Sequence, residues 1–205
     1  NPYAYAAEHL APEIMKAGGH FSHAVYQHSK LSLREFEGAR VRTAEINGCM
    51  VCQQFRAARD VGAMFAANGM RDAHTVADNG PAPDEAFYAA VPEWRTSPVF
   101  SDRERLAIEF AERFGTEPKA LSADDAFWTR MHDAYSDAEI ADLANSVAAW
   151  VGLGRVAHVL GFDQVCLPFA EAAEQGSAKL RQEFHHQAAD IVRPFQLDHV
   201  AGLGQ

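Results

Sequence analysis

Two cysteines separated by two residues are the first candidates for chemistry in this sequence. Cys49 and Cys52 form a Cys-x-x-Cys motif directly after Asn47-Gly48. Residues three apart share one face of a helix, and their sulfur atoms are within reach of a disulfide bond. Unsatisfied N–H groups at a helix start also favour a thiolate. The spacing predicts a redox pair in which one thiolate attacks a hydroperoxide oxygen or a disulfide sulfur and the other closes the disulfide.

A positive charge near the pair supports this interpretation. Arg56 stands four residues after Cys52. If one helix runs from Cys49 to Asn68, the guanidinium of Arg56 lies on the cysteine face and stabilises a thiolate. We therefore expect Arg56 to belong to the site.

Other uses of the cysteine pair stay open. A structural zinc site needs four ligands, and the sequence contains no second Cys-x-x-Cys motif. A purely structural disulfide or two buried, inert thiols are further alternatives, because cysteine is one of the most buried residue types. The third cysteine, Cys166, has no partner at motif spacing and is interpreted as a small buried apolar residue.

Composition excludes several functional classes. The 205 residues carry 18 Lys and Arg against 28 Asp and Glu, a formal charge of -10 without a local basic stripe, which disfavours nucleic acids and anionic lipid surfaces. The longest apolar stretch, Val147 to Gly154, is too short to span a bilayer. No secretory signal is recognised at the start, so we expect a cytoplasmic protein. The sequence also lacks a glycine-rich phosphate loop, and its His20, His23 and His28 cluster is poorly spaced for a metal, so we expect neither cofactor nor metal.

Helix signals dominate the chain and predict an all-α fold. Three Ser-x-x-Glu capping boxes begin at Ser32, Ser101 and Ser136, and a Ser-x-x-Asp variant begins at Ser122. No stretch shows the two-residue period of a strand. We expect helices over 33–47, 49–68, 84–90, 102–115, 137–161 and 169–191, with another after Ser122.

These elements are expected to form one domain over residues 1–205. Residues 1–30 are rich in aromatic and aliphatic side chains and are interpreted as an extension that packs on the core or on another subunit. Together with the apolar helix after Ser136, they exceed what a small helical domain can bury. We therefore expect a homotrimer or a homohexamer.

The flanks of the cysteine pair carry a family resemblance. The stretch 37–52 resembles the core of the carboxymuconolactone decarboxylase and AhpD-like alkylhydroperoxidase superfamily, whose hallmark is Asn-Gly-Cys-x-x-Cys after a helix with a Glu twelve residues before the first cysteine. The segments before the helices at Ser101 and Ser136 also look similar to that family. The residues that match the pattern are Glu37, Arg42, Asn47, Gly48, Cys49 and Cys52.

The resemblance implies an AhpD-like helical bundle, assembled as trimers or hexamers, and a thiol-dependent peroxidase or disulfide oxidoreductase. It implies Cys52 as the thiolate that attacks peroxide, Cys49 as the resolving thiol and Glu37 as the proton-relay carboxylate. An external thiol or a protein reductant then completes the cycle. Where the family has a histidine four residues after the second cysteine, this chain has Arg56, which stabilises a thiolate but exchanges no proton near neutral pH. His158 is a candidate replacement, although a core histidine is the simpler interpretation.

Two further functions stay open beside the peroxidase. The cysteine-free branch of the superfamily contains lyases that act on a lactone bearing a carboxylate. In that case Arg56, with Arg42 or Arg155, would bind a small organic acid through bidentate hydrogen bonds. A non-catalytic oligomeric protein with inert cysteines is the other alternative.

Overall fold

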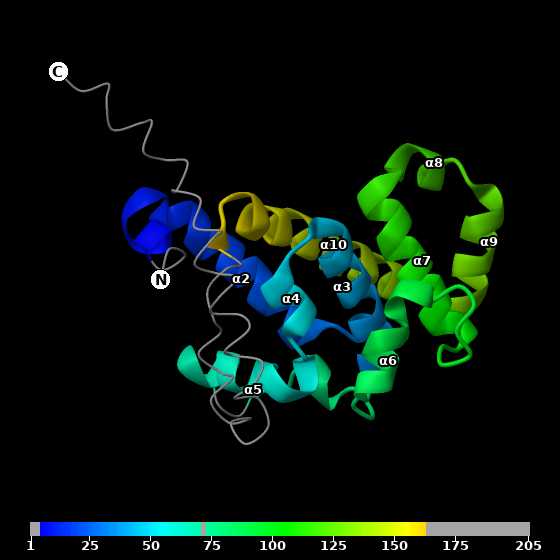
Figure 1. The fold of residues 1–205 in the computed structure, drawn as a ribbon, viewed down its shortest axis with the longest axis horizontal. Helices are drawn as coiled ribbons and strands as arrows, with labels where there is room; N and C mark the ends of the chain where they lie inside the picture. Colours follow the sequence, from blue (N-terminus) through cyan, green and yellow to red (C-terminus); the bar gives the residue numbers. More distant parts are fainter. Residues whose placement is uncertain (1–4, 71–72, 163–205) are drawn as a thin grey trace, which may run out of the picture.

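The computed structural model describes residues 5–70 and 73–162, and this part of the chain is helical without a strand (Figure 1). The all-α prediction is confirmed for these residues. The predictions made for Cys166 and for a helix over 169–191 lie outside them. The helices are η1 (Ala6–Leu10), α2 (Pro12–His28), α3 (Leu33–Asn47), α4 (Met50–Gln54), α5 (Ala57–Ala67), η2 (Val76–Asp78), α6 (Glu85–Ala90), η3 (Val91–Glu93), α7 (Asp102–Thr116), α8 (Pro118–Ser122), α9 (Asp125–Ala134) and α10 (Asp137–Val159).

The three predicted Ser-x-x-Glu capping boxes are confirmed. In each, the serine hydroxyl accepts the N–H of the Glu three residues later at 3.3 Å, and the Glu carboxylate accepts the serine N–H at 2.7–3.1 Å. They begin α3 at Ser32, α7 at Ser101 and α10 at Ser136. The prediction at Ser122 is wrong, because Ser122 ends α8 and Asp124 caps α9 instead.

The predicted helix over 49–68 is broken in its middle. Phe55 and Arg56 adopt extended backbone angles between α4 and α5. Because of this break, the i, i+4 relation between Cys52 and Arg56 does not hold. The chain changes direction between α4 and α5.

Helix α3 lies at the centre of the fold and positions the cysteine motif that follows it. It packs most extensively against α7 and next against α10. The approach to α7 is close at Gly38, where an added Cβ would lie 3.0 Å from the Ile108 side chain. Against α10, the Phe36 ring meets the edge of the Trp150 ring, with centroids 4.7 Å apart. Figure 1 shows α7, α8 and α9 gathered at one end of the molecule and η1 at the other.

The last turns of α10 leave apolar side chains exposed. Val156, Val159 and Leu160 are 43%, 74% and 41% exposed, and Ile14 of α2 is 77% exposed. The N-terminal helices nevertheless contribute to the core, since Tyr26 of α2 is buried in it. No helix in the described residues is long and apolar enough to cross a membrane.

Candidate functional site

The predicted cysteine pair is joined by a disulfide bond in the structure. The Cα atoms of Cys49 and Cys52 lie 5.3 Å apart. Cys49 caps α4, and its sulfur accepts the N–H of Cys52 at 3.3 Å. Cys49 is fully buried, whereas Cys52 is partly exposed and lines a cavity. The two sulfur atoms are thus unequal, and Cys52 is the one that a small molecule in the cavity can reach.

Asn47 and Gly48 fix the position of the motif. Gly48 ends α3 in the left-handed conformation, with φ of 69°, which favours glycine. The side-chain amide of Asn47 donates to the carbonyl of Trp150 at 2.8 Å, and its oxygen accepts from Arg155 Nε at 3.1 Å. Gly154 allows this contact, because a Cβ there would lie 2.6 Å from Asn47 Nδ2. The motif is therefore anchored to α10.

A buried ion pair lies directly beneath α4. Glu37 is fully buried and Arg40 is 3% exposed. Arg40 Nε and Nη2 donate to the two carboxylate oxygens of Glu37 at 2.5 and 3.1 Å. Burial alone would lower the pKa of Arg40, but the paired carboxylate outweighs it and raises the pKa. The guanidinium therefore stays charged although it is removed from water.

Arg40 connects this pair to the cysteine motif. Its Nη1 donates to the carbonyl of Cys52 at 2.6 Å, and its Nη2 donates to the carbonyl of Phe55 at 2.6 Å. These carbonyls belong to the end of α4, where backbone acceptors lack helical partners. Arg40 thus caps the short helix that carries Cys52.

Glu37 is surrounded by donors. Besides Arg40, it accepts the Tyr88 hydroxyl at 2.7 Å and the Ala57 N–H at 3.2 Å. Burial and the neighbouring carboxylate raise the pKa of Tyr88, so its hydroxyl remains a donor. The contacts of Glu37 therefore reach Cys52 through Arg40, and they join α3, α5 and α6 at one carboxylate.

Arg56 lies apart from the cysteine face where the sequence analysis placed it. Its Nε and Nη2 donate to Glu85 at 3.1 and 3.0 Å, and Nη1 donates to the carbonyl of Gln53 at 2.6 Å. The guanidinium carbon also stands 3.8 Å from the centroid of the Tyr88 ring. The break after α4 is the physical reason, because it turns Arg56 towards α6.

The other two candidate residues, Arg42 and His158, have different surroundings. Arg42 donates to Glu45 at 2.7 Å and to Glu112 at 2.8 Å, so it links α3 to α7. His158 is exposed, and the interpretation as a core histidine is wrong. Its imidazole lies against Gly48, where an added Cβ would be 3.2 Å from Cε1 and Nε2. His158 is therefore beside the residue that precedes Cys49.

The cavity at Cys52 is small and mainly apolar, with a volume of about 200 Å³. It lies between α2, α3, α4, α5 and α10. Its polar side chains include Tyr26, Arg40, Asn47 and Trp150, and its apolar ones include Phe55 and Met64. Burial raises the pKa of Tyr26 to about 12. The Tyr26 hydroxyl is therefore a donor at any physiological pH.

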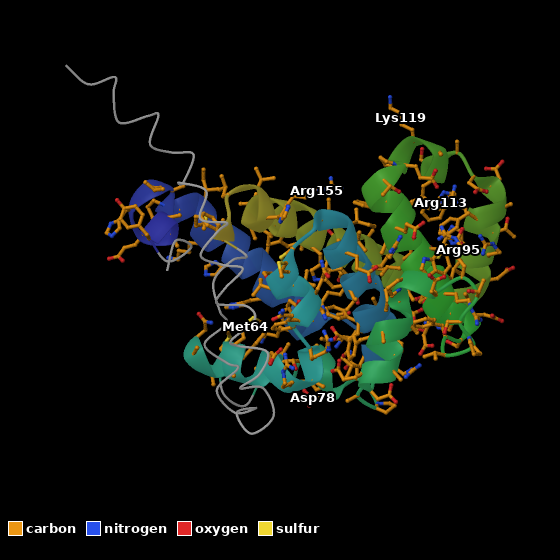
Figure 2. All side chains as sticks on the ribbon, viewed as in Figure 1. Met64, Asp78, Arg95, Arg113, Lys119 and Arg155 are labelled. Carbon is orange, nitrogen blue, oxygen red and sulfur yellow. A yellow bond between two sulfur atoms is a disulfide. The ribbon has the colours of Figure 1, made fainter. Side chains whose placement is uncertain are left out.

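A larger hollow lies between α7 and α9, far from the cysteines. Its arginines already bind carboxylates of the chain: Arg95 binds Glu112, and Arg130 binds Glu109 at 3.1 Å. Figure 2 shows Arg95 and Arg113 at this end of the molecule, and Arg155 on α10. The smaller cavity is the better candidate for a reactive site, because Cys52 of the disulfide lines it.

Sequence analysis missed Arg40, Tyr88 and Trp150. The signal available for Arg40 was its position three residues after Glu37, which puts a complementary pair on one helix face. Tyr88 and Trp150 come from distant helices, so no local pattern indicates them. The described residues contain no cluster of three His, Cys, Asp or Glu side chains that could hold a metal ion.

Comparison with known proteins gives a similarity over a short stretch of the chain. No protein-family model matches the chain, and no solved structure matches it. The uncharacterized protein YnjA of Escherichia coli K12 is 50% identical to this chain over 50 residues. That stretch covers 24% of this chain and 26% of YnjA, so the similarity spans about a quarter of each protein.

Proposed function

We propose that this protein is a thiol-dependent oxidoreductase that reduces hydroperoxides, or exchanges disulfides, through Cys49 and Cys52. The observation that carries the proposal is the disulfide itself: one sulfur is enclosed and the other borders a cavity. An accessible Cys52 suits the attacking thiolate, and a buried Cys49 suits the resolving thiol. This is the division of roles that the family resemblance implies.

The reaction balances with two thiols and one hydroperoxide. The Cys52 thiolate attacks the terminal oxygen, so that an S–O bond forms and the O–O bond breaks, releasing an alkoxide that takes up a proton. Cys49 then attacks the sulfenic acid, forming the disulfide and releasing water. An external thiol or a protein reductant supplies the two electrons that restore the thiols.

The AhpD-like architecture and the oligomeric state belong to the same proposal. The exposed apolar side chains of Val156 and Val159 on α10 and of Ile14 on α2 support a homotrimer or homohexamer. Light scattering at micromolar concentration tests this, and a monomeric mass would contradict it.

The lyase alternative receives less support from the geometry. A lyase needs a free cation for the substrate carboxylate, and Arg56 and Arg42 already bind carboxylates of their own chain. Arg155 donates to Asn47 and to the carbonyl of Gly115. The redox function therefore remains the proposal.

A thiol count tests the proposed function. The reduced protein contains three thiols, and one equivalent of an alkyl hydroperoxide should remove two of them while one equivalent of alcohol forms. Cys52→Ser should abolish the rapid loss. Cys166→Ser is the matched control and should still lose two thiols. Unchanged thiols in the wild type, or a disulfide that includes Cys166, would contradict the proposal.

A further inference from the structure

The cavity at Cys52 exists because two of the buried side chains on its wall are small. Ala44 of α3 and Ala149 of α10 both line it, and they are only 3% and 2% exposed. Buried positions at the centre of a fold commonly carry side chains that fill the interior, as Leu143 and Val147 do on α10. The two alanines instead leave a cavity of about 200 Å³.

A cavity of this size is uncommon in a protein interior. Protein cores are close-packed, and a space left by smaller side chains lowers the stability of the fold. The place of this cavity distinguishes it from a packing defect, because Cys52, the accessible half of the disulfide, is part of its wall. A molecule that reacts with Cys52 can therefore fill the space.

The polar groups on the cavity wall already have partners within the chain. The guanidinium of Arg40 is bound by a carboxylate of α3 and by two backbone carbonyls. The side-chain amide of Asn47 donates to a carbonyl of α10, and its oxygen accepts from Arg155. The hydroxyl of Tyr26 has the indole of Trp150 as its hydrogen-bonding neighbour. A bound molecule is therefore recognised mainly by the apolar part of the wall, through burial of its own apolar surface.

We propose that Ala44 and Ala149 determine which hydroperoxides Cys52 accepts, by leaving space for a compact apolar substituent such as a branched alkyl or an aryl group. This inference rests on the proposed peroxidase function and assigns two specificity-determining residues to it. While the Cys52 thiolate attacks the terminal oxygen, the substituent on the other oxygen lies against apolar side chains such as Phe55 and Met64, and it then leaves as part of the alcohol. Hydrogen peroxide carries no substituent and gains nothing from the cavity.

The test fills the cavity and compares two oxidants. The reduced protein is oxidised by cumene hydroperoxide or by hydrogen peroxide, and thiol counts after rapid quenching give the two rate constants. Their ratio cancels any change in the thiolate fraction of Cys52. Ala149→Val should lower the ratio of the cumene hydroperoxide constant to the hydrogen peroxide constant at least about tenfold, since one methylene in an apolar pocket already changes discrimination about 10-fold or more. The matched control Ala148→Val, one residue away on α10 and outside the cavity lining, should keep the wild-type ratio.

The outcomes separate the two proposals. If neither peroxide oxidises the wild type, the proposed function fails. If the wild type reacts and Ala149→Val lowers the ratio by less than about tenfold, the alanines are packing residues and this inference is overturned. A second measurement needs no variant and decides the question if Ala149→Val does not fold. The wild-type ratio should exceed that of free cysteine at least about tenfold, and a smaller preference would also overturn the inference.

Discussion

Replacing Glu37 with glutamine should destabilise the whole fold as well as slow the redox reaction. Glu37 is fully buried and accepts two bonds from Arg40, one from Tyr88 and one from the Ala57 N–H. Glutamine keeps the size of the side chain but removes its charge, and its amide adds donors where donors already point. Arg40, which is 3% exposed, is left as a buried cation without a counter-ion.

The size of the effect follows from that unpaired charge. Breaking a buried ion pair by removing one partner costs about 3–5 kcal/mol, mostly because the remaining charge stays desolvated. With a urea m-value of about 2 kcal/mol per molar, Glu37→Gln should lower the unfolding midpoint by roughly 2 M. Circular dichroism during urea titration measures this shift directly.

Two control variants make the measurement specific. Asp102→Asn removes a fully exposed partner of Arg105 and should not change the midpoint measurably. Glu37→Gln combined with Arg40→Met removes both charges and should recover part of the loss, although the carbonyls of Cys52 and Phe55 then lack their donor. A Glu37→Gln protein with the wild-type midpoint would refute the buried pair as described.

Three further predictions concern the cysteines and their surroundings. In the reduced protein, iodoacetamide should label Cys52 before Cys49, as peptide mapping will show, because only Cys52 borders the cavity. Arg56→Ala should change that labelling rate by less than about twofold, since its guanidinium is bound elsewhere. Burial opposes ionisation of Glu104, but its bond with Arg34 helps to lower the pKa below the ordinary 4.5. The stabilisation from the ionised Glu104 is thus present above pH 4.5 and is lost as the pH falls through the lowered pKa. Glu104→Gln should therefore cost about 2 kcal/mol at pH 7 in urea titrations, and less as the pH falls through that pKa.

Short sequence motifs were sufficient to predict several of the helix boundaries. A capping box needs only a Ser and a Glu three residues apart, and those at Ser32, Ser101 and Ser136 begin helices as predicted. The stop at Gly48 is equally local, because the left-handed backbone there favours glycine. The disulfide between the cysteines also followed from their spacing.

The break between α4 and α5 could not be predicted in the same way. Neither Phe55 nor Arg56 is a residue that ends helices, and no glycine or proline lies nearby. The hydrogen bonds that satisfy the backbone groups at the break come from side chains of α3. Arg40 donates to the Phe55 carbonyl, and Glu37 accepts the N–H of Ala57. Because a buried ion pair on another helix stabilises this break, the residues around Phe55 carry no sequence signal that predicts it. The position of Arg56 was wrong for that reason.

Helix α4 is held by two kinds of bond, and only one of them changes in a redox cycle. The disulfide joins the capping residue Cys49 to Cys52 and opens on reduction. The hydrogen bonds from Arg40 to the carbonyls of Cys52 and Phe55 involve no sulfur, and Glu37 keeps Arg40 in place. We expect these bonds to persist in the dithiol form, so that the sulfur of Cys52 stays at the cavity without a new ordering of the backbone. If the proposed redox function holds, we expect Glu37 to act as a positioning residue through Arg40, a role that requires no transfer of a proton.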